Sequence, residues 1–505
     1  MDSAYDSLRK RLREVATLGS AAGLLGWDQE TMMPPRAAAF RAEELSLIAT
    51  LAHERFTDPA VGDWIARCES DADLTADDVR AAELRELRRD WDRATKLPPA
   101  LVAEITETGS LAMEAWKQAR ADSEFEAFRP WLVKQLALHR RKAECYGTPE
   151  GGELYDALID EYEPGMRAAE AEKLFRPLRE ALAPLIAELT SSPHQPDQAP
   201  AHVHLDVEPQ REFNRRIAAG VGYDFGAGRL DSSTHPFTSG IGPGDTRITT
   251  RYDEDQFVDT MYSTLHEAGH GLYEQGLPKN GLYGLPSSEA VSLGIHESQS
   301  RLWENQVGRS RAFWEWALPV AREVFGPPLD GFTVDNYYAA VNTVRPRLIR
   351  VESDEVTYNL HIMLRFDIER ALFRDDIEVS DVPGVWNERM KSDLGLDVPD
   401  DRRGCLQDIH WSMGSFGYFP TYTFGNLYAG QLWEAISKAI PDLQESMSRG
   451  EFAPLLAWLR DNLHRHGRRY SATELSERLT NQPLGHEPLM RYLENKLRAI
   501  YRAGA

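Results

Sequence analysis

Two histidines lie one helical turn apart in the segment His266-Glu267-Ala268-Gly269-His270, an H-E-x-x-H pattern. A separation of four residues is about one turn of an α-helix, so both imidazoles project from the same face and can bind one cation. Glu267 then lies beside the next coordination position, where its carboxylate can accept a proton from water. The spacing therefore predicts a zinc site with Glu267 as the general base of a hydrolytic reaction.

A catalytic zinc ion usually has three protein ligands and leaves its fourth position to water, so a further ligand must come from elsewhere in the chain. The next histidine is His296, which adjoins Glu297 on a helix expected to start near Ser287 or Ser288 and to end before Gly308. A helix that returns beside the first can place either His296 or Glu297 opposite the histidine pair. Because a carboxylate completes a His2Glu set known from zinc hydrolases, we assign Glu297 as the third ligand.

The elements that must position these residues are predicted to be mainly α-helical, because apolar residues recur at intervals of three and four along most of the chain. The histidine-bearing helix is expected to begin at Asp253, a favourable N-cap residue with Gln256 three positions on. It is predicted to carry an apolar stripe at helical spacing, Phe257, Met261, Leu265 and Leu272. An amphipathic helix is predicted over about residues 4–26, with Pro34-Pro35 stopping it. Further helices are predicted over residues 36–52, 76–95, 99–121, 125–146 and 209–221, and over the tail from 431 to 501.

Residues 229–250 differ in character, because β-branched residues surround a glycine-rich turn and predict a small hairpin just before the histidine-bearing helix. In zinc peptidases of this general plan, an edge strand beside the metal helix can pair with an extended substrate. Asp245, Arg247 and Thr249 alternate, so they share one face of such a strand. Arg247 is therefore a candidate for substrate contact or for a structural ion pair with a neighbouring segment, and the sequence leaves both open.

The composition indicates a soluble intracellular protein. The net charge of −23 over 505 residues argues against nucleic acid or anionic membranes as partners. Three scattered cysteines are too few for a disulfide framework, and a reducing cytoplasm fits them best. The N-terminus lacks the apolar region of a signal peptide, and no run of about 18 apolar residues predicts a membrane span. We therefore expect a cytoplasmic location.

Two later segments carry further polar residues. Residues 342–372 show an apolar helical pattern in which Arg350 and Asp354 are four apart and can form an ion pair on one face. The segment 404–422 has no clean period and the profile of a functional loop. Its polar candidates are His410, Tyr418 and Tyr422.

Five ordered motifs resemble the carboxypeptidase Taq family of zinc metallocarboxypeptidases. They are Asp245-Thr246-Arg247-Ile248-Thr249 for D-x-R-x-T, the H-E-x-x-H pattern, His296-Glu297-Ser298-Gln299 for H-E-S-Q, Ile349 to Asp354 for I-R-x-x-A-D, and Gly404 to Trp411 for G-x-x-Q-D-x-H-W. The fourth departs from the pattern, with Ser353 where alanine is usual, which leaves Arg350 and Asp354 in place.

The resemblance covers nearly the whole chain and implies a single domain over residues 1–505, with about 1–200 as a helical groove wall and about 201–505 as the catalytic part. It implies a mainly helical fold like that of neurolysin and angiotensin-converting enzyme, with a deep active-site groove, a small β-sheet beside the zinc helix, and a homodimer. It further implies removal of single C-terminal residues from peptides, with broad specificity. The cofactor expected is one Zn2+ per chain, for which Co2+ can substitute.

The resemblance also suggests roles outside the metal ligands. A tyrosine is expected to donate to the developing oxyanion, as in relatives of this fold, with Tyr418 and Tyr422 as the candidates and His410 near the substrate. Recognition of a free C-terminal carboxylate needs a cation, and Arg350 is our choice because a guanidinium can form two parallel hydrogen bonds to it. A buried salt bridge between Arg350 and Asp354 is the structural alternative.

Two other classes of function compete with a carboxypeptidase. A zinc oligopeptidase that cuts internal bonds would share the metal ligands but would not depend on a free C-terminus. A non-catalytic peptide-binding scaffold on the same fold is less favoured, because the sequence keeps Glu267.

Overall fold

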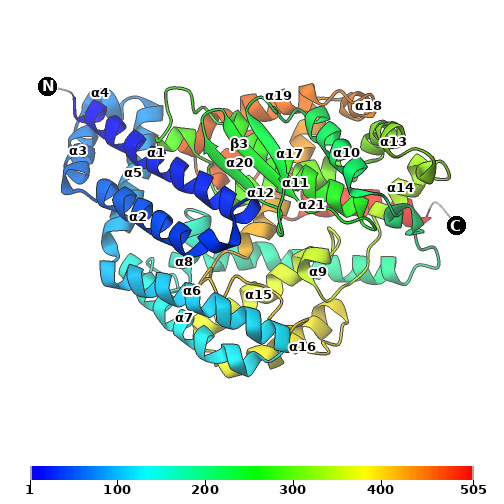
Figure 1. The fold of residues 1–505 in the computed structure, drawn as a ribbon, viewed down its shortest axis with the longest axis horizontal. Helices are drawn as coiled ribbons and strands as arrows, with labels where there is room; N and C mark the ends of the chain where they lie inside the picture. Colours follow the sequence, from blue (N-terminus) through cyan, green and yellow to red (C-terminus); the bar gives the residue numbers. More distant parts are fainter. Residues whose placement is uncertain (1–2, 503–505) are drawn as a thin grey trace. The chain divides into compact units, whose positions relative to one another are not determined.

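The computed structural model of the protein describes residues 3–502. Its contacts divide the chain into two compact units, each assembled from three stretches of sequence. The first unit comprises residues 1–94, 197–341 and 429–483, and the second comprises residues 95–196, 342–428 and 484–505. Among the described residues the fold is mainly helical with one small sheet, as predicted (Figure 1). The prediction of a single domain stays a prediction.

The first unit contains the helices α1 (Ala4–Thr31), α2 (Ala38–Phe56), α3 (Pro59–Glu69), α4 (Ala72–Thr75), α5 (Asp78–Lys96), α10 (Val207–Gly220), α11 (Phe257–Gly276), α12 (Leu293–Arg301), α13 (Arg311–Phe325), α14 (Val334–Val341), α18 (Leu443–Ser448), α19 (Ala453–Asn462) and α20 (Ala472–Thr480). Its strands are β1 (Gly228–Ser232), β2 (Thr238–Gly242) and β3 (Asp245–Thr250). The second unit contains α6 (Pro99–Asp122), α7 (Phe125–Tyr146), α8 (Asp156–Tyr162), α9 (Ala168–Thr190), α15 (Tyr358–Phe373), α16 (Val382–Leu394) and α21 (Glu487–Arg502). The helix α17 (Pro420–Ala439) begins in the second unit and ends in the first, and the last two residues of α5 belong to the second unit.

The first helix is longer than its apolar pattern predicted. Ser3 caps α1 by accepting a hydrogen bond from the amide of Asp6, and the helix continues to Thr31, so the segment from Trp27 onward is helical. Its inner face joins α3 and α5 in an apolar core, to which the segment after α11 contributes Leu285. The N-terminal helices are therefore part of the same core as the residues that follow the H-E-x-x-H pattern.

The sheet has the strand order β1-β3-β2, with β1 parallel and β2 antiparallel to β3. The predicted hairpin corresponds to β2 and β3, and β1 was not foreseen as a separate strand. β3 is the central strand, so the expectation that the strand with Asp245, Arg247 and Thr249 could be an edge is wrong. Both backbone edges of β3 are already paired, and the edge strands of this sheet are β1 and β2.

The helix α11 begins later than predicted. Its N-cap is Gln256, whereas the carboxylate of Asp253 accepts a hydrogen bond from the amide of Asp255 and so closes a local turn. The apolar stripe predicted for this helix is buried, including Phe257 and Leu265. The position of the stripe was thus correct, and the predicted capping residue was wrong.

The returning helix α12 also starts late, at Leu293, because residues 286–288 form only a short 3-10 turn. Ser292 caps α12 by accepting a hydrogen bond from the amide of Ile295 at 3.0 Å. After Arg301 the helix widens into a π-helical segment, Leu302–Val307, and ends before Gly308 as predicted.

The second unit is organised around α15, which packs against α7, α9 and α16 (Figure 1). Its predicted extent of 342–372 was too long at the N-terminal side, because α15 begins at Tyr358. Asp354 accepts hydrogen bonds from the amides of Val356 and Thr357 and so ends the preceding irregular segment. Within residues 3–502, no helix is long and apolar enough to cross a membrane.

Candidate active site

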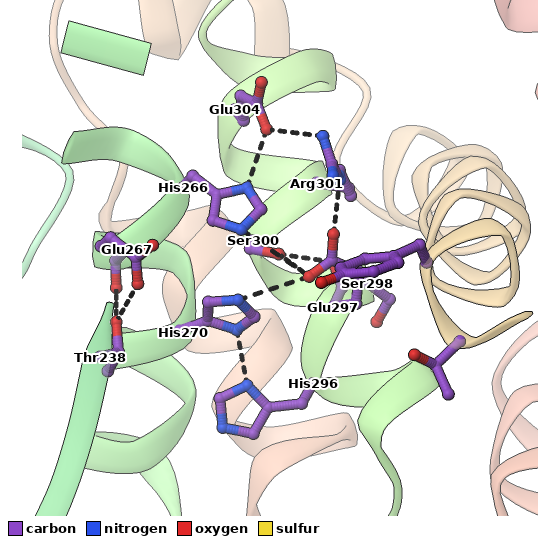
Figure 2. A network of polar contacts seen from close by, with 12 residues as sticks. Thr238, His266, Glu267, His270, His296, Glu297, Ser298, Ser300, Arg301 and Glu304 are labelled. Atoms are coloured by element: carbon purple, nitrogen blue, oxygen red, sulfur yellow. Dashed lines mark hydrogen bonds and ion pairs between the residues drawn. The ribbon is translucent and has the colours of Figure 1, made fainter. Parts of the chain in front are cut away.

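His266 and His270 project from α11 towards Glu297 of α12 (Figure 2). The Nε2 atoms of His266 and His270 lie 3.7 and 3.4 Å from Oε2 of Glu297. One ligand atom from each residue falls within 4.8 Å of the other two. Donor atoms around a tetrahedral zinc ion, at bond lengths of about 2.0–2.1 Å, are separated by similar distances, so the donor set fits this metal.

The glycine between the two histidines permits this arrangement. A Cβ on Gly269 would lie 2.6 Å from both the carbonyl oxygen of Gln299 and the Cα of Ser300. The backbones of α11 and α12 therefore approach at this point, and only a residue without a side chain fits between them. Close approach of the two helices brings Glu297 within reach of both histidines.

The other ring nitrogen of each histidine has its own partner. Nδ1 of His266 lies 2.9 Å from a carboxylate oxygen of Glu304, and Nδ1 of His270 lies 2.6 Å from Nδ1 of His296 (Figure 2). His296 in turn bonds Glu274 through Nε2 at 3.1 Å. These contacts orient both rings with Nε2 towards Glu297. His296 therefore contacts the nitrogen of His270 that does not face Glu297.

Glu297 is held as an anion. Its Oε1 accepts a hydrogen bond from Nε of Arg301 at 2.6 Å, and Ser300 donates to Oε2 at 3.2 Å. Burial alone would raise the pKa of Glu297, but Arg301 and His266 lower this pKa well below its ordinary value. His270 is held neutral, since burial and the neighbouring His296 lower its pKa to about 3. An ionised carboxylate and a neutral imidazole are the forms that bind a metal cation.

Glu267 lies on α11 beside the edge strand β2. The hydroxyl of Thr238 donates to its Oε2 at 2.6 Å, which fixes the carboxylate (Figure 2). The side chain is 6 % exposed, and burial raises the pKa of Glu267. Thr238 was not found from the sequence, because the bond joins residues 29 positions apart and no local pattern predicts it.

Arg247 is engaged within the first unit. Both Nε and one Nη of its guanidinium lie 2.8 Å from the carboxylate of Asp245, and its Cζ lies 4.4 Å from the ring centre of Trp27. The ion pair lies within the strand β3 itself, whereas the alternative left open by the sequence was a pair with a neighbouring segment.

The Arg350–Asp354 ion pair proposed from the sequence is wrong. Arg350 bonds Asp408 instead, through Nε at 3.1 Å and Nη2 at 2.8 Å, and donates to the Tyr358 hydroxyl at 2.9 Å. The four-residue spacing implied a helix, but residues 350–352 form a single 3-10 turn followed by extended Ser353, so the two side chains diverge. Asp408 also receives a hydrogen bond from Nε of Arg365 at 2.7 Å.

His410, Tyr418 and Tyr422 lie together in the second unit. Nε2 of His410 is 3.3 Å from the Tyr422 hydroxyl, and its ring centre is 5.3 Å from that of Tyr418. Burial is the main cause that lowers the pKa of His410 to about 3, so its imidazole is neutral at ordinary pH. The predicted functional loop is therefore a compact cluster of three polar rings.

Some polar partners at these sites were missed from the sequence. Glu304 lies seven residues after Glu297, about two helical turns, and this spacing could have indicated it. Asp408 stands in the G-x-x-Q-D-x-H-W motif, but its pairing with Arg350 spans 58 positions and had no local signal.

Comparison with known proteins places the chain in a family. Residues 7–497 match the family model for carboxypeptidase Taq (M32) metallopeptidase. Thermostable carboxypeptidase 1 of Thermus thermophilus is 45 % identical over 99 % of both chains, and carboxypeptidase 1 of Bacillus subtilis is 35 % identical over 97 % of both. Among solved structures, the M32 carboxypeptidase from Deinococcus radiodurans R1 matches with a TM-score of 0.95 and 40 % identity, covering 99 % of this chain and 100 % of the other.

The fold and these matches define the chain as a metallopeptidase of the carboxypeptidase class. It belongs to the carboxypeptidase Taq family. Metallocarboxypeptidase 1 of Trypanosoma cruzi, 35 % identical, shares the fold with a TM-score of 0.92 over 98 % of this chain and 99 % of that one. The family and the class of enzyme predicted from the five motifs are both confirmed.

Proposed function

We propose that this chain is a zinc-dependent metallocarboxypeptidase that removes single C-terminal residues from peptides with broad specificity. The observation that carries the proposal is the convergence of His266, His270 and Glu297 on one point, next to the buried Glu267. Membership of the carboxypeptidase Taq family supports the peptide substrate. One Zn2+ per chain is the proposed cofactor, and Co2+ can substitute for it.

In the proposed reaction, His266, His270 and Glu297 would hold the zinc ion. When bound, the ion supplies Lewis acidity that polarises the scissile carbonyl and lowers the pKa of water. Glu267 accepts the proton of the attacking water and later delivers it to the leaving amine. The bond from Thr238 supports this role, because it holds the carboxylate in one orientation.

Arg350 is the proposed partner of the terminal carboxylate. Arg350 and Arg365 share one carboxylate, that of Asp408, so these three groups carry one excess positive charge. Arg350 and Arg365 are 5 % and 0 % exposed, and a buried excess charge is costly unless an anion compensates it. The free C-terminus of a peptide would supply this anion. Only three of the five N–H donors of Arg350 are used by Asp408 and Tyr358.

The tyrosine roles remain part of the proposal. Tyr418 or Tyr422 donates a hydrogen bond to the developing oxyanion, and His410 contacts the substrate nearby. Arg247 is proposed as a support of the strand β3 through Asp245, and substrate contact is its alternative role. A homodimer and a cytoplasmic location are further proposals, and the former predicts a solution mass near twice the 57.1 kDa of one chain.

The test uses one peptide in two forms, with a free and with an amidated C-terminus, incubated with the purified enzyme. We expect stepwise loss of single C-terminal residues from the free acid, read by mass spectrometry, slow turnover of the amide, and loss of both after chelation with recovery on adding zinc. Equal cleavage of both forms at internal bonds would establish an oligopeptidase instead. A zinc-loaded protein that binds peptide and leaves it intact would establish a scaffold.

A further inference from the structure

The second unit also contains a buried carboxylate that belongs to none of the ion pairs described above. Glu369 of α15 is 0 % exposed and, among the described residues, has no Lys, Arg or His within ion-pair distance. Three donors surround it instead. The Tyr155 hydroxyl at 2.5 Å and the Gly417 amide at 2.8 Å donate to Oε2, and the Trp411 indole at 2.8 Å donates to Oε1.

Two of these donors, Trp411 and Gly417, lie at the two ends of the turn between His410 and Tyr418. Trp411 directly follows His410, and Gly417 directly precedes Tyr418. One carboxylate therefore holds both ends of the turn that joins His410 to Tyr418. This turn has little room to shift, because Gly417 has a φ of +86° and a Cβ there would lie 2.7 Å from the backbone carbon of Leu158.

The chemistry of the donors matches an ionised carboxylate. An indole N–H and a backbone N–H can only donate, so neither can accept a proton from a neutral carboxyl group. Burying a carboxylate without a cation is costly, and charge-assisted hydrogen bonds are what offset that cost. The carboxylate of Asp408, in the same unit, is compensated differently, because two arginines bond it. The ionised carboxylate of Glu369 therefore accepts its hydrogen bonds from the loop and from Tyr155.

We propose that Glu369 is a positioning residue that sets the spacing between His410 and Tyr418 through its bonds to Trp411 and Gly417. It does not touch the substrate. This inference rests on the proposed function, since it concerns the groups that we assign to the substrate and the oxyanion. It adds a residue that lies 41 positions before His410 and belongs to none of the five motifs.

The test compares Glu369→Gln with a matched control, Asp156→Asn. Asp156 is also a buried carboxylate of the second unit, and it accepts hydrogen bonds from the backbone amides of Glu153 at 2.9 Å and Ala168 at 2.7 Å, neither of which lies in the loop. Burial raises the pKa of Glu369 to about 7, so assays are run at about pH 8.5, where the carboxylate is mostly ionised.

We expect Glu369→Gln to lower kcat for free-acid peptides by about tenfold to a hundredfold, as a small misplacement of reacting groups does. KM should change less, since an oxyanion donor acts in the transition state. Zinc content should stay at one per chain. Asp156→Asn should keep most of the parental kcat, even where its unfolding midpoint falls as far as that of Glu369→Gln.

Two further variants separate positioning from general stability. Trp411→Phe keeps a ring but removes the indole donor, and it should reproduce the loss in kcat. Trp411→Phe also tests the inference if Glu369→Gln does not fold. The double variant should be little worse than either single one, because both remove the same interaction. Tyr155→Phe removes the donor that is not in the loop and, assayed at a pH where Glu369 stays ionised, should lower kcat less than Trp411→Phe does.

If the parent enzyme is active and Glu369→Gln keeps the same kcat as the Asp156→Asn control, this inference alone is overturned. Additive losses in the double variant with Trp411→Phe would do the same. A parent enzyme that releases no C-terminal residue would overturn the proposed function, and this inference with it.

Discussion

At the scale of single residues, the contacts around the histidine pair distinguish the groups that face the proposed metal from those that orient them. Glu297 lies against Nε2 of both histidines, whereas Glu304 and His296 bond the Nδ1 atoms. Groups that orient a metal ligand commonly tune affinity by about tenfold to a hundredfold, while loss of a ligand removes the site. This difference makes the roles separable by mutation.

The general base can be tested without disturbing the metal. Glu267→Gln should keep zinc at one per chain, because Glu267 is not among the converging ligands. Turnover should fall by at least about 10²–10⁴-fold, since the amide cannot accept the proton of water. The measurements are kcat and metal content of the same preparation. Substantial activity in the zinc-loaded variant would remove Glu267 from this role.

The third ligand is decided between neighbours in sequence. Glu297→Ala leaves two histidines and should lose most of its zinc, whereas His296→Ala should bind zinc about tenfold to a hundredfold more weakly and still fill in excess metal. Competition with a chromogenic chelator measures both affinities. If His296→Ala lost its metal and Glu297→Ala retained it, the ligand assignment would pass to His296.

Arg350→Ala tests recognition of the terminal carboxylate. We expect kcat/KM for free-acid peptides to fall by the equivalent of about 2–5 kcal/mol, as when one partner of a buried charged pair is removed. Amidated peptides should be affected little, and Arg350→Lys should recover only part of the loss. Arg347→Ala, an exposed arginine of the same segment, is the control and should change neither substrate.

The ratio of acid to amide activity is the decisive quantity for Arg350. Arg350→Ala leaves Asp408 with Arg365 alone, so some loss of stability is expected whatever Arg350 does in catalysis. An equal fall for both substrates would assign Arg350 to support of the fold through Asp408.

At the scale of elements, the approach of α11 to α12 depends on Gly269. A glycine inside a helix is usually destabilising relative to alanine by about 0.5–1 kcal/mol, so replacement normally helps. Gly269→Ala should instead destabilise by about 1–3 kcal/mol and weaken zinc binding, because its Cβ would meet backbone atoms of α12. Gly19→Ala in α1, where nothing lies within 4 Å, is the control and should stabilise. Chemical denaturation and zinc titration measure both effects, and a stabilised Gly269→Ala with intact zinc affinity would contradict the argument.

Local spacing predicted the elements that carry the metal residues but not their partners. The pair His266 and His270 and the buried stripe of α11 follow from a period that any helix imposes. The bonds from Thr238 to Glu267 and from Asp408 to Arg350 depend on tertiary contacts between distant segments, which no periodicity encodes. The predicted Arg350–Asp354 pair failed because the irregular backbone around Pro346 and Ser353 does not continue the helix of α15.

At the scale of the whole molecule, the order of the sequence does not match the order of the compact units. The first unit takes residues 1–94 together with 197–341, so the catalytic part predicted from about 201 onward shares a core with the N-terminal helices. Leu285, eight residues before α12, packs in one cluster with Leu8 and Leu12 of α1. The Tyr283 hydroxyl also donates to the carbonyl oxygen of Ala16 at 3.0 Å.

A fragment of residues 201–505 is therefore predicted not to fold or to bind zinc by itself, although it contains all the proposed ligands. It lacks α1 to α5, and the apolar cluster around Leu285 would be exposed to water.

The control is the full chain cut at a protease site inserted in the loop after α9, which ends at Thr190. The cut removes no core residue, so the two pieces should stay associated and keep zinc and activity. Size-exclusion chromatography, zinc content and peptide hydrolysis compare the two preparations. A monomeric, zinc-loaded 201–505 fragment would show that the metal site does not need the N-terminal helices, and the first unit would then consist of separable parts.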